Sequence, residues 1–176
     1  MKWTIRWVPA LVLAGLLSGT ALADGIAPAD RQVWTRYVNE RFGVFAEVPA
    51  LGFAAEPPPE NGDGQAWTAP PDVEIAVYGN YWTVMTDSFA AYRDMQRGYL
   101  TDDGATITYE PERTNWFVFS GYLADGRIFY DKTVIMPGCD VSANVHMVYP
   151  RDQRTPMDAI TTRVAGSLAL DAGACG

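Results

Sequence analysis

Residues 115–149, NWFVFSGYLADGRIFYDKTVIMPGCDVSANVHMVY, predict three strands joined by two tight turns. Runs rich in β-branched and aromatic residues cover 115–123, 127–136 and 139–149. Asp125-Gly126 separates the first two runs, and a two-residue Asp-Gly loop is the strongest hairpin signal in sequence. Pro137-Gly138 marks the second turn. The stretch therefore predicts an antiparallel meander.

The strands of this meander differ in the faces that they bury. Successive residues of Trp116-Phe117-Val118-Phe119 are all apolar, so both faces of that strand must be covered. Residues 141–147 alternate strictly between apolar and polar, which predicts a wetter second face. A mainly antiparallel sheet with a doubly buried centre needs helices on both sides. We therefore expect a single α+β domain with three layers, α/β/α.

Outside residues 115–149, the sequence predicts further strands over 34–39, 44–48, 73–82 and 105–109, with turns at 40–43 and 112–114. A helix capped by Asp87 or Ser88 is expected to stop near Gly98. A second helix is expected to start at Thr155-Pro156-Met157-Asp158. Pro57-Pro58-Pro59 and the following residues to Gly64 predict a loop by their turn chemistry.

The first 23 residues have the three parts of a secretory signal. Lys2 and Arg6 are the positive region, residues 8–17 are the apolar region, and Ala21-Leu22-Ala23 is a small-x-small cleavage site. We expect cleavage between Ala23 and Asp24, which leaves residues 24–176 as the mature domain. The residue after the site is Asp24 and not a Cys, which excludes lipid attachment to the new N-terminus, and the apolar run is too short for a membrane anchor. The expected location is the periplasm.

Export also bears on the two cysteines, Cys139 and Cys175. An oxidising compartment lets them pair, whereas exchange catalysts favour the spacing C-x-x-C. A bridge closing a loop of about 35 residues stabilises the folded chain by roughly 3.5–4 kcal/mol in the chain-entropy model. We predict a structural disulfide between them.

Charge excludes several classes of partner. The chain has 13 Lys+Arg and 21 Asp+Glu, and removal of Lys2 and Arg6 with the signal leaves 11 basic against 21 acidic residues, a net charge of −10. Such an acidic domain lacks the excess of positive charge that binding to nucleic acid or to an anionic membrane surface requires. The small number of His and Cys residues, one and two, excludes most zinc sites.

We predict no cofactor, since no Gly-rich phosphate loop or dinucleotide fingerprint is present.

A family resemblance adds to this interpretation. Residues 37–43, YVNERFG, followed by Val48-Pro49 and by the predicted order of elements, resemble the PsbP-like fold. That fold is shared by an extrinsic subunit of photosystem II, a Ran-binding nuclear-import factor and bacterial exported proteins. The resemblance implies a non-enzymatic accessory protein that binds a protein partner, and it carries no functional residue to a numbered position here.

Catalytic chemistry has few candidates. Residues 59–70 fail as an EF-hand loop, because prolines stand where carboxylates are required, so 61–64 predict a plain Asx/Gly turn. His146 shares a strand face with Ser142 and Asn144 and is expected to face solvent or to bond locally. Asp131 shares a face with Phe129 and would need a partner such as an Arg if buried. Asp102-Asp103 predicts a solvated turn.

Aromatic side chains are the richest feature of the sequence. Tyr78, Tyr81 and Trp82 lie near the end of one predicted strand, where they form a candidate binding surface, although core packing is the alternative. Two functional hypotheses follow. One is a periplasmic binding or accessory protein whose partner is a protein or a small apolar ligand. The other is a carboxylate-based hydrolase acting on cell-envelope material, which would depend on Asp131. The sequence leaves the oligomeric state open.

Overall fold

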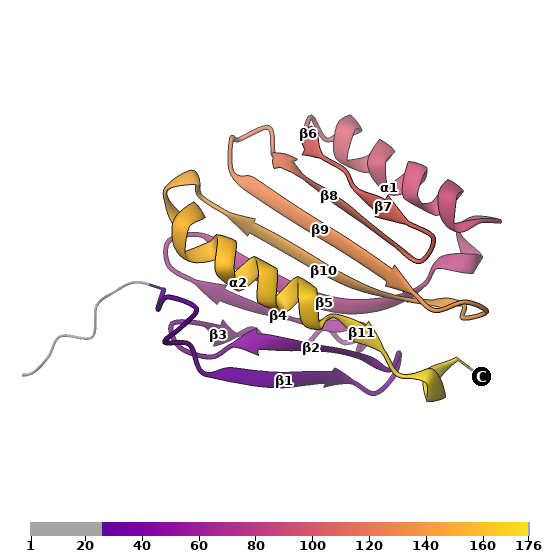
Figure 1. Cartoon of the computed structure of the whole chain (residues 1–176), viewed down its shortest axis with the longest axis horizontal. Helices are drawn as coiled ribbons and strands as arrows, with labels where there is room; N and C mark the ends of the chain where they lie inside the picture. Colours follow the sequence, from indigo (N-terminus) through magenta and orange to yellow (C-terminus); the bar gives the residue numbers. More distant parts are fainter. Residues whose placement is uncertain (1–25, 176) are drawn as a thin grey trace, which may run out of the picture.

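Two antiparallel sheets and two helices make up the computed structural model, which describes residues 26–175 (Figure 1). The predicted signal peptide and its cleavage site at Ala23 and Asp24 lie outside the described residues. No helix among residues 26–175 is long and apolar enough to cross a membrane.

The smaller sheet contains β1 (Trp34–Asn39), β2 (Val44–Pro49) and β11 (Ala169–Leu170), in the order β1-β2-β11. The larger sheet contains β3 (Ala54–Ala55), β4 (Gly64–Ala69), β5 (Val73–Tyr81), β6 (Thr106–Tyr109), β7 (Glu112–Arg113), β8 (Trp116–Tyr122), β9 (Ile128–Ile135) and β10 (Val141–Tyr149). Its order is β3-β4-β5-β10-β9-β8-β6, and β7 pairs with β8. The meander predicted from residues 115–149 thus forms the centre and one side of this sheet.

The helices are α1 (Phe89–Asp102) and α2 (Arg154–Ser167), and short 3-10 helices are η1 (Trp82–Val84), η2 (Arg151–Gln153) and η3 (Ala172–Ala174). Helix α1 begins where predicted, because the Ser88 hydroxyl accepts a hydrogen bond from the Ala91 amide. It continues past Gly98 to Asp102, since a glycine within a helix costs only about 1 kcal/mol and packing against the sheet outweighs that cost.

Two hydrophobic clusters lie on opposite faces of strand β10. Residues such as Val145 and Met147 pack with Met157, Ile160 and the apolar side of β2. Val148 points the other way, into a cluster with Tyr92, Phe117, Phe119 and Phe129 under α1. The prediction that residues 116–119 are covered on both faces is confirmed, since all but the half-buried Trp116 are buried.

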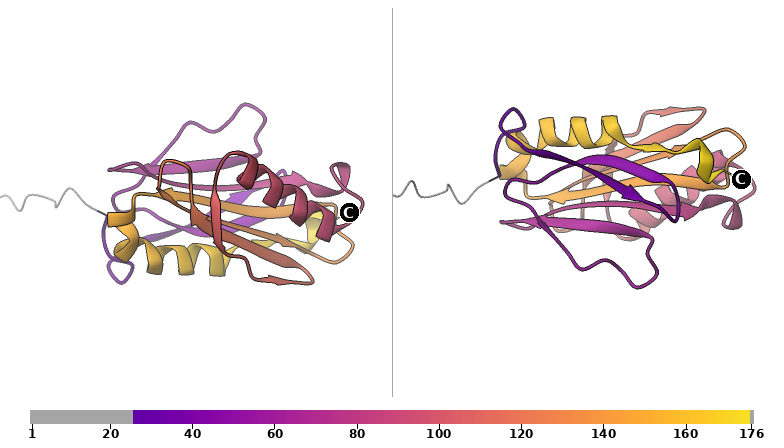
Figure 2. Two further views of the ribbon diagram at one scale, coloured as in Figure 1. Left: turned by 90° about the horizontal axis from the view of Figure 1, so that it is seen from above. Right: turned by 90° about the horizontal axis from the view of Figure 1, so that it is seen from below.

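The three-layer expectation needs correction. The antiparallel α+β class is confirmed, but the strands form two sheets, and β2 of the smaller sheet shares the first cluster with α2. Figure 2 shows α2 on one side of the larger sheet and the long loop before β4 projecting from the other. The structure is therefore two antiparallel sheets with two helices, rather than a single sheet between helical layers.

The 123–127 turn also differs from prediction. The Leu123 amide donates to the Arg127 carbonyl at 2.9 Å, so the loop has three residues rather than the two of a simple Asp-Gly turn. Gly126 takes φ 87°, which is the left-handed conformation that such three-residue loops require. Strands β3, β4, β7 and β11 were not predicted, and β7 occupies the stretch where we expected only a turn.

Candidate functional site

Helix α1 covers only part of the sheet face on which it lies. Ser142 and Asn144 of β10 are buried beneath it, whereas His146, further along the strand, is partly exposed. Beyond His146 the face continues through Ala76 of β5 to Ala66 of β4, which are paired in register. The sheet face is therefore open between α1 and the loop that precedes β4.

Two hollows adjoin on this face. The first is a cavity of about 190 Å³ between α1 and the sheet, and the second is an open hollow of about 450 Å³ beside the Pro-rich loop. Tyr78 lines both. The cavity is lined by Tyr78, Gln96, Tyr99, Leu100, Asp103, Phe117, Phe119, Asp131, Lys132, Thr133, Asn144, Val145 and His146, and the hollow by Pro57, Pro59, Asn61, Asp63, Gly64, Gln65, Ala66, Ala76, Val77 and Tyr78. We call the two together the α1 groove.

A chain of buried and half-buried polar side chains underlies the cavity. Thr133 Oγ1 donates to Asn144 Oδ1 at 2.9 Å, and Asn144 Nδ2 donates to Ser142 Oγ at 3.1 Å. The chain continues through Asn80, which accepts from Ser142 Oγ at 2.5 Å and donates to the Tyr92 hydroxyl at 2.9 Å. These bonds satisfy groups that burial would otherwise penalise, and they tie α1 to the sheet.

This chain overturns one expectation. The polar face of residues 141–147 was predicted to be wetter, but Ser142 is fully buried and Asn144 is 3% exposed. The cause is α1, whose side chains cover that face, together with hydrogen-bond partners on β5 and β9. Sequence alternation alone cannot distinguish a solvated polar face from one buried with its partners.

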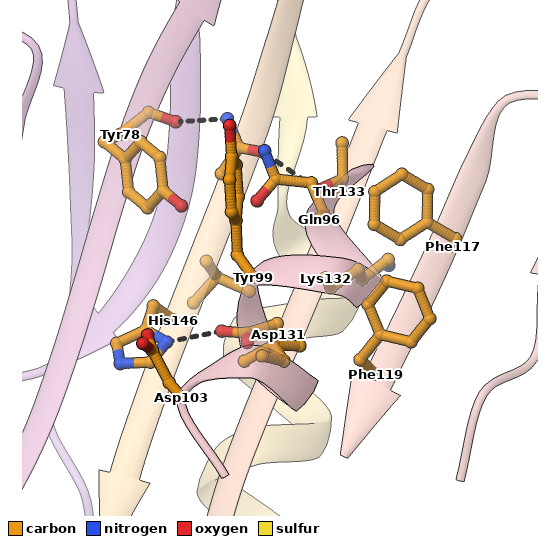
Figure 3. A pocket seen from close by; sticks show the side chains of 13 residues that line it. Tyr78, Gln96, Tyr99, Asp103, Phe117, Phe119, Asp131, Lys132, Thr133 and His146 are labelled. Atoms are coloured by element: carbon orange, nitrogen blue, oxygen red, sulfur yellow. Dashed lines mark hydrogen bonds and ion pairs between the residues drawn. The ribbon is translucent and has the colours of Figure 1, made fainter. Parts of the chain in front are cut away.

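Asp131 and His146 contact each other in the cavity, and they form an ion pair when the imidazole is protonated (Figure 3). They are opposite one another on the adjacent strands β9 and β10, and Asp131 Oδ1 is hydrogen-bonded to His146 Nδ1. Their side chains are 22% and 34% exposed. The partner that a half-buried Asp131 requires is thus this histidine, rather than an arginine.

The contact between Asp131 and His146 affects the pKa of His146 itself and that of the neighbouring Tyr78. Burial lowers the pKa of His146, but the hydrogen bond that the imidazole donates to Asp131 and the negative charge of that carboxylate outweigh burial, so the net pKa is raised. The pKa of the Tyr78 hydroxyl is raised by burial and, to a smaller extent, by the negative charge of Asp131. Tyr78 is therefore a neutral hydrogen-bonding group at any physiological pH.

We expect the stability of the protein to fall as pH rises through the folded-state pKa of His146. Because that pKa lies above the usual value of about 6.5, the pair contributes fully below about pH 6.5 and its contribution is lost at higher pH. Thermal unfolding of the wild-type protein and of His146→Gln across about pH 5.5–9 measures this contribution. Equal pH dependence in the two proteins would contradict it.

The three aromatic residues singled out from the sequence separate in the structure. Tyr78 lines the groove, whereas Tyr81 is 45% exposed and contacts Phe42, outside the cavity and the hollow. Trp82 lies in η1, where its ring packs against Phe89 and its Nε1 donates to the Cys139 carbonyl at 2.9 Å. Of the three, Tyr78 contributes to the α1 groove.

Of the other candidates of the sequence, Asp63 lines the hollow and Asp103 lines the cavity. Asp63 of the predicted Asx turn pairs with Arg41 at 2.8 Å, so a guanidinium occupies the position that a cation would take. Asp102 and Asp103 are exposed at the end of α1, and Asp103 reaches the cavity. In the described part of the chain no cluster of three or more His, Cys, Asp and Glu could hold a metal.

Sequence reasoning missed the contribution of α1 to the site. Gln96, Tyr99 and Asp103 line the cavity, and Tyr99 is 57% exposed. The available signal was Tyr99 itself, a large aromatic at the expected end of an amphipathic helix.

The structure joins Cys139 and Cys175 in a disulfide, which holds the C-terminal segment after β11 next to the turn before β10. Cys139 is buried, and the bridge lies outside the α1 groove. Its position is that of a structural bond.

Comparison with known proteins establishes a likeness of fold. No family model matches the chain, and no curated protein matches it in sequence. The Ran-binding protein Mog1p of Saccharomyces cerevisiae has a similar structure, with a TM-score of 0.56 and 11% identity over 82% of this chain and 100% of that chain. Cyanobacterial PsbP (CyanoP) of Synechocystis gives a TM-score of 0.55 and 14% identity over 88% and 99%.

A third solved structure is LpqN of Mycobacterium tuberculosis, involved in cell envelope biogenesis. Its TM-score is 0.50 and its identity 14%, over 80% of this chain and 91% of that chain. The predicted PsbP-like fold is therefore confirmed. At these identities the likeness establishes the fold alone, and function must be argued from the groove.

Proposed function

We propose that this chain is an exported, non-enzymatic binding or accessory protein that holds a protein partner in the α1 groove. One observation carries the proposal: the sheet face is open between α1 and the Pro-rich loop, and a half-buried tyrosine, Tyr78, and an exposed one, Tyr99, line it. Large aromatic side chains in a concave surface are characteristic anchors of protein–protein contacts.

Two further lines support an accessory role. Mog1p is described as Ran-binding and LpqN as involved in cell envelope biogenesis, so proteins of this fold serve as binding or accessory factors. The disulfide fits an oxidising compartment, and the first 23 residues have the composition of a cleavable signal. We therefore propose the periplasm as the location, with Asp24 as the first residue of the mature chain.

The candidate surface of Tyr78, Tyr81 and Trp82 is revised in this proposal. Tyr78 remains a contact residue, as it lines both parts of the groove. Trp82 serves packing at the start of α1, and Tyr81 is left as an exposed aromatic outside the cavity and the hollow.

Partner binding should depend on Tyr99. We expect Tyr99→Ala to reduce cross-linking to the partner in intact cells about tenfold or more, because a central aromatic anchor contributes about 2 kcal/mol or more. Tyr109→Ala is the matched control, since Tyr109 is also 57% exposed but lines neither the cavity nor the hollow. Equal capture by the two variants would reject the groove as the binding surface.

A hydrolase remains the second candidate, because Asp103 and Asp131 line one cavity and glycosidases need two carboxyls across a cleft. Against it, Asp131 is engaged by His146, and about 190 Å³ is below the roughly 300–1,000 Å³ of ligand pockets. Turnover of envelope glycans that disappears in Asp131→Asn with an unchanged melting curve would favour the enzyme. If the wild-type protein turns over none of these substrates, the hydrolase hypothesis is rejected.

A further inference from the structure

We infer that the cavity of the α1 groove receives the ammonium group of a lysine side chain presented by the protein partner. The inference rests on the proposed function and adds the chemistry of its central contact. The cavity combines aromatic rings, Tyr78 and Tyr99, with the carboxylates of Asp131 and Asp103 (Figure 3). Rings and carboxylates together favour an alkylammonium ion, through cation–π attraction and charge-assisted hydrogen bonds.

The size of the cavity restricts the occupant. At about 190 Å³ it is smaller than pockets for drug-sized ligands, which begin at roughly 300 Å³. It has room for a single extended side chain, while the adjoining open hollow of about 450 Å³ leaves space for the backbone that carries it. The Pro57 to Gly64 loop forms the outer wall of that hollow.

Charge around the cavity favours a cation. The nine ion pairs within residues 26–175 leave Asp103 without a cationic partner. Lys132, although it contributes to the lining, directs its Nζ to the Ala165 carbonyl of α2 at 2.6 Å. His146 is therefore the one cationic partner for the negative charges of Asp131 and Asp103 among the described residues. The predicted mature chain is itself strongly acidic.

The same geometry favours lysine over arginine. Asp131 Oδ1 is already hydrogen-bonded to His146, which closes off a bidentate pairing of that carboxylate with a guanidinium. An ammonium needs no paired acceptor, because its three donors rotate freely on a compact point charge. One oxygen of Asp131, the Asp103 carboxylate and an aromatic face are enough to hold it.

Lysine and the proton of His146 then compete for Asp131. The charged and titratable groups that act on His146 or line the cavity beside it come from several elements. They are Asp131 and Lys132 from β9, Glu74 and Tyr78 from β5, Tyr99 from α1 with Asp103 just after it, and Arg127 before β9. A bound ammonium adds positive charge beside the imidazole, so binding should lower the affinity of His146 for its proton. By reciprocal linkage, lysine binds more tightly at high pH than at low pH.

The test is an NMR titration of the exported protein with Nα-acetyl-lysine N-methylamide. Nα-acetyl-norleucine N-methylamide is the matched probe, because it lacks only the amine. At about pH 8.5, where the proton of His146 competes less for Asp131 than at acidic pH, we expect the lysine probe to shift the signals of His146 and Tyr99 and the norleucine probe to leave them unchanged. Equal responses to the two probes, or none to either, would overturn the inference.

Asp131→Asn should weaken binding of the lysine probe about tenfold or more, since a hydrogen bond to a charged group contributes about 1.5–3 kcal/mol. Asp102→Asn is the control for the lost charge, because it also removes one carboxylate, at the end of α1 next to Asp103 but outside the cavity. Unchanged affinity in Asp131→Asn would overturn the inference. A stronger response to the corresponding arginine derivative would reject lysine as the occupant.

A further test uses only the wild-type protein, so its outcome does not depend on whether a variant folds. Saturation with the lysine probe should lower the pKa of His146 measured by NMR, and affinity should fall between about pH 8.5 and about pH 6. An unchanged pKa would overturn the inference. If Tyr99→Ala abolishes partner capture while Asp131→Asn retains it, the proposed groove stands and the lysine contact is wrong.

Discussion

Replacing Phe117 by alanine is expected to lower the free energy of unfolding by about 3–5 kcal/mol, the range for a large aromatic removed from a core. Phe117 is 1% exposed. Its ring lies 5.3 Å from that of Phe89, 6.2 Å from that of Tyr92 and 5.2 Å from that of Phe119, measured between centroids. For a domain of this size the melting temperature should fall by roughly 6–20 °C.

The loss should be concentrated in α1, because this cluster holds the helix against the sheet. Hydrogen exchange would detect it as faster exchange of the α1 amides than of the β2 amides. Phe45→Ala is the control, since Phe45 is half-buried on β2, outside this cluster, and should cost about 1 kcal/mol. A loss below about 1 kcal/mol for Phe117→Ala would mean that the cluster does not position the helix.

The parts of the fold that sequence could predict are those with a strong local signal. β1 was predicted at its observed bounds, and β5, β8, β9 and β10 to within two residues or so, because alternation and turn residues frame them. Gly64-Gln65-Ala66 opens β4 without β-branched residues, so its strand conformation comes from pairing with β5. β11 has two residues and exists only through its pairing with β2.

The site was less predictable because it depends on register. If Pro137 and Gly138 were the two loop residues, Asp131 would pair with Asn144. In the structure Cys139 belongs to the turn and bonds to Cys175, the strand resumes at Val141, and Asp131 pairs with His146. Sequence alternation predicts which face of its own strand Asp131 or His146 occupies. The register between β9 and β10 and the position of α1 are what bring the two side chains together in a cavity.

Loss of the disulfide should have the second large effect. Cys139 and Cys175 are separated by 36 residues, so the chain-entropy model expects the double variant Cys139→Ala, Cys175→Ala to lose about 4 kcal/mol of stability. Denaturant unfolding of this variant, and of wild-type protein with and without reductant, measures the loss. Reduced wild-type protein should match the variant, and a difference between them would indicate a packing effect of the substitutions rather than the bond.

The same variant separates stability from binding. The bridge joins the end of η3 to the turn before β10, and the Asp171 amide just before η3 donates to the Gly43 carbonyl at 2.8 Å. The groove lies elsewhere, between α1 and the Pro-rich loop. At temperatures well below its lower melting point, the variant should therefore bind the lysine probe within about twofold of wild type, since distant sites are usually independent. A tenfold loss would mean instead that the bridge positions α1, through the Trp82 indole that donates to the Cys139 carbonyl.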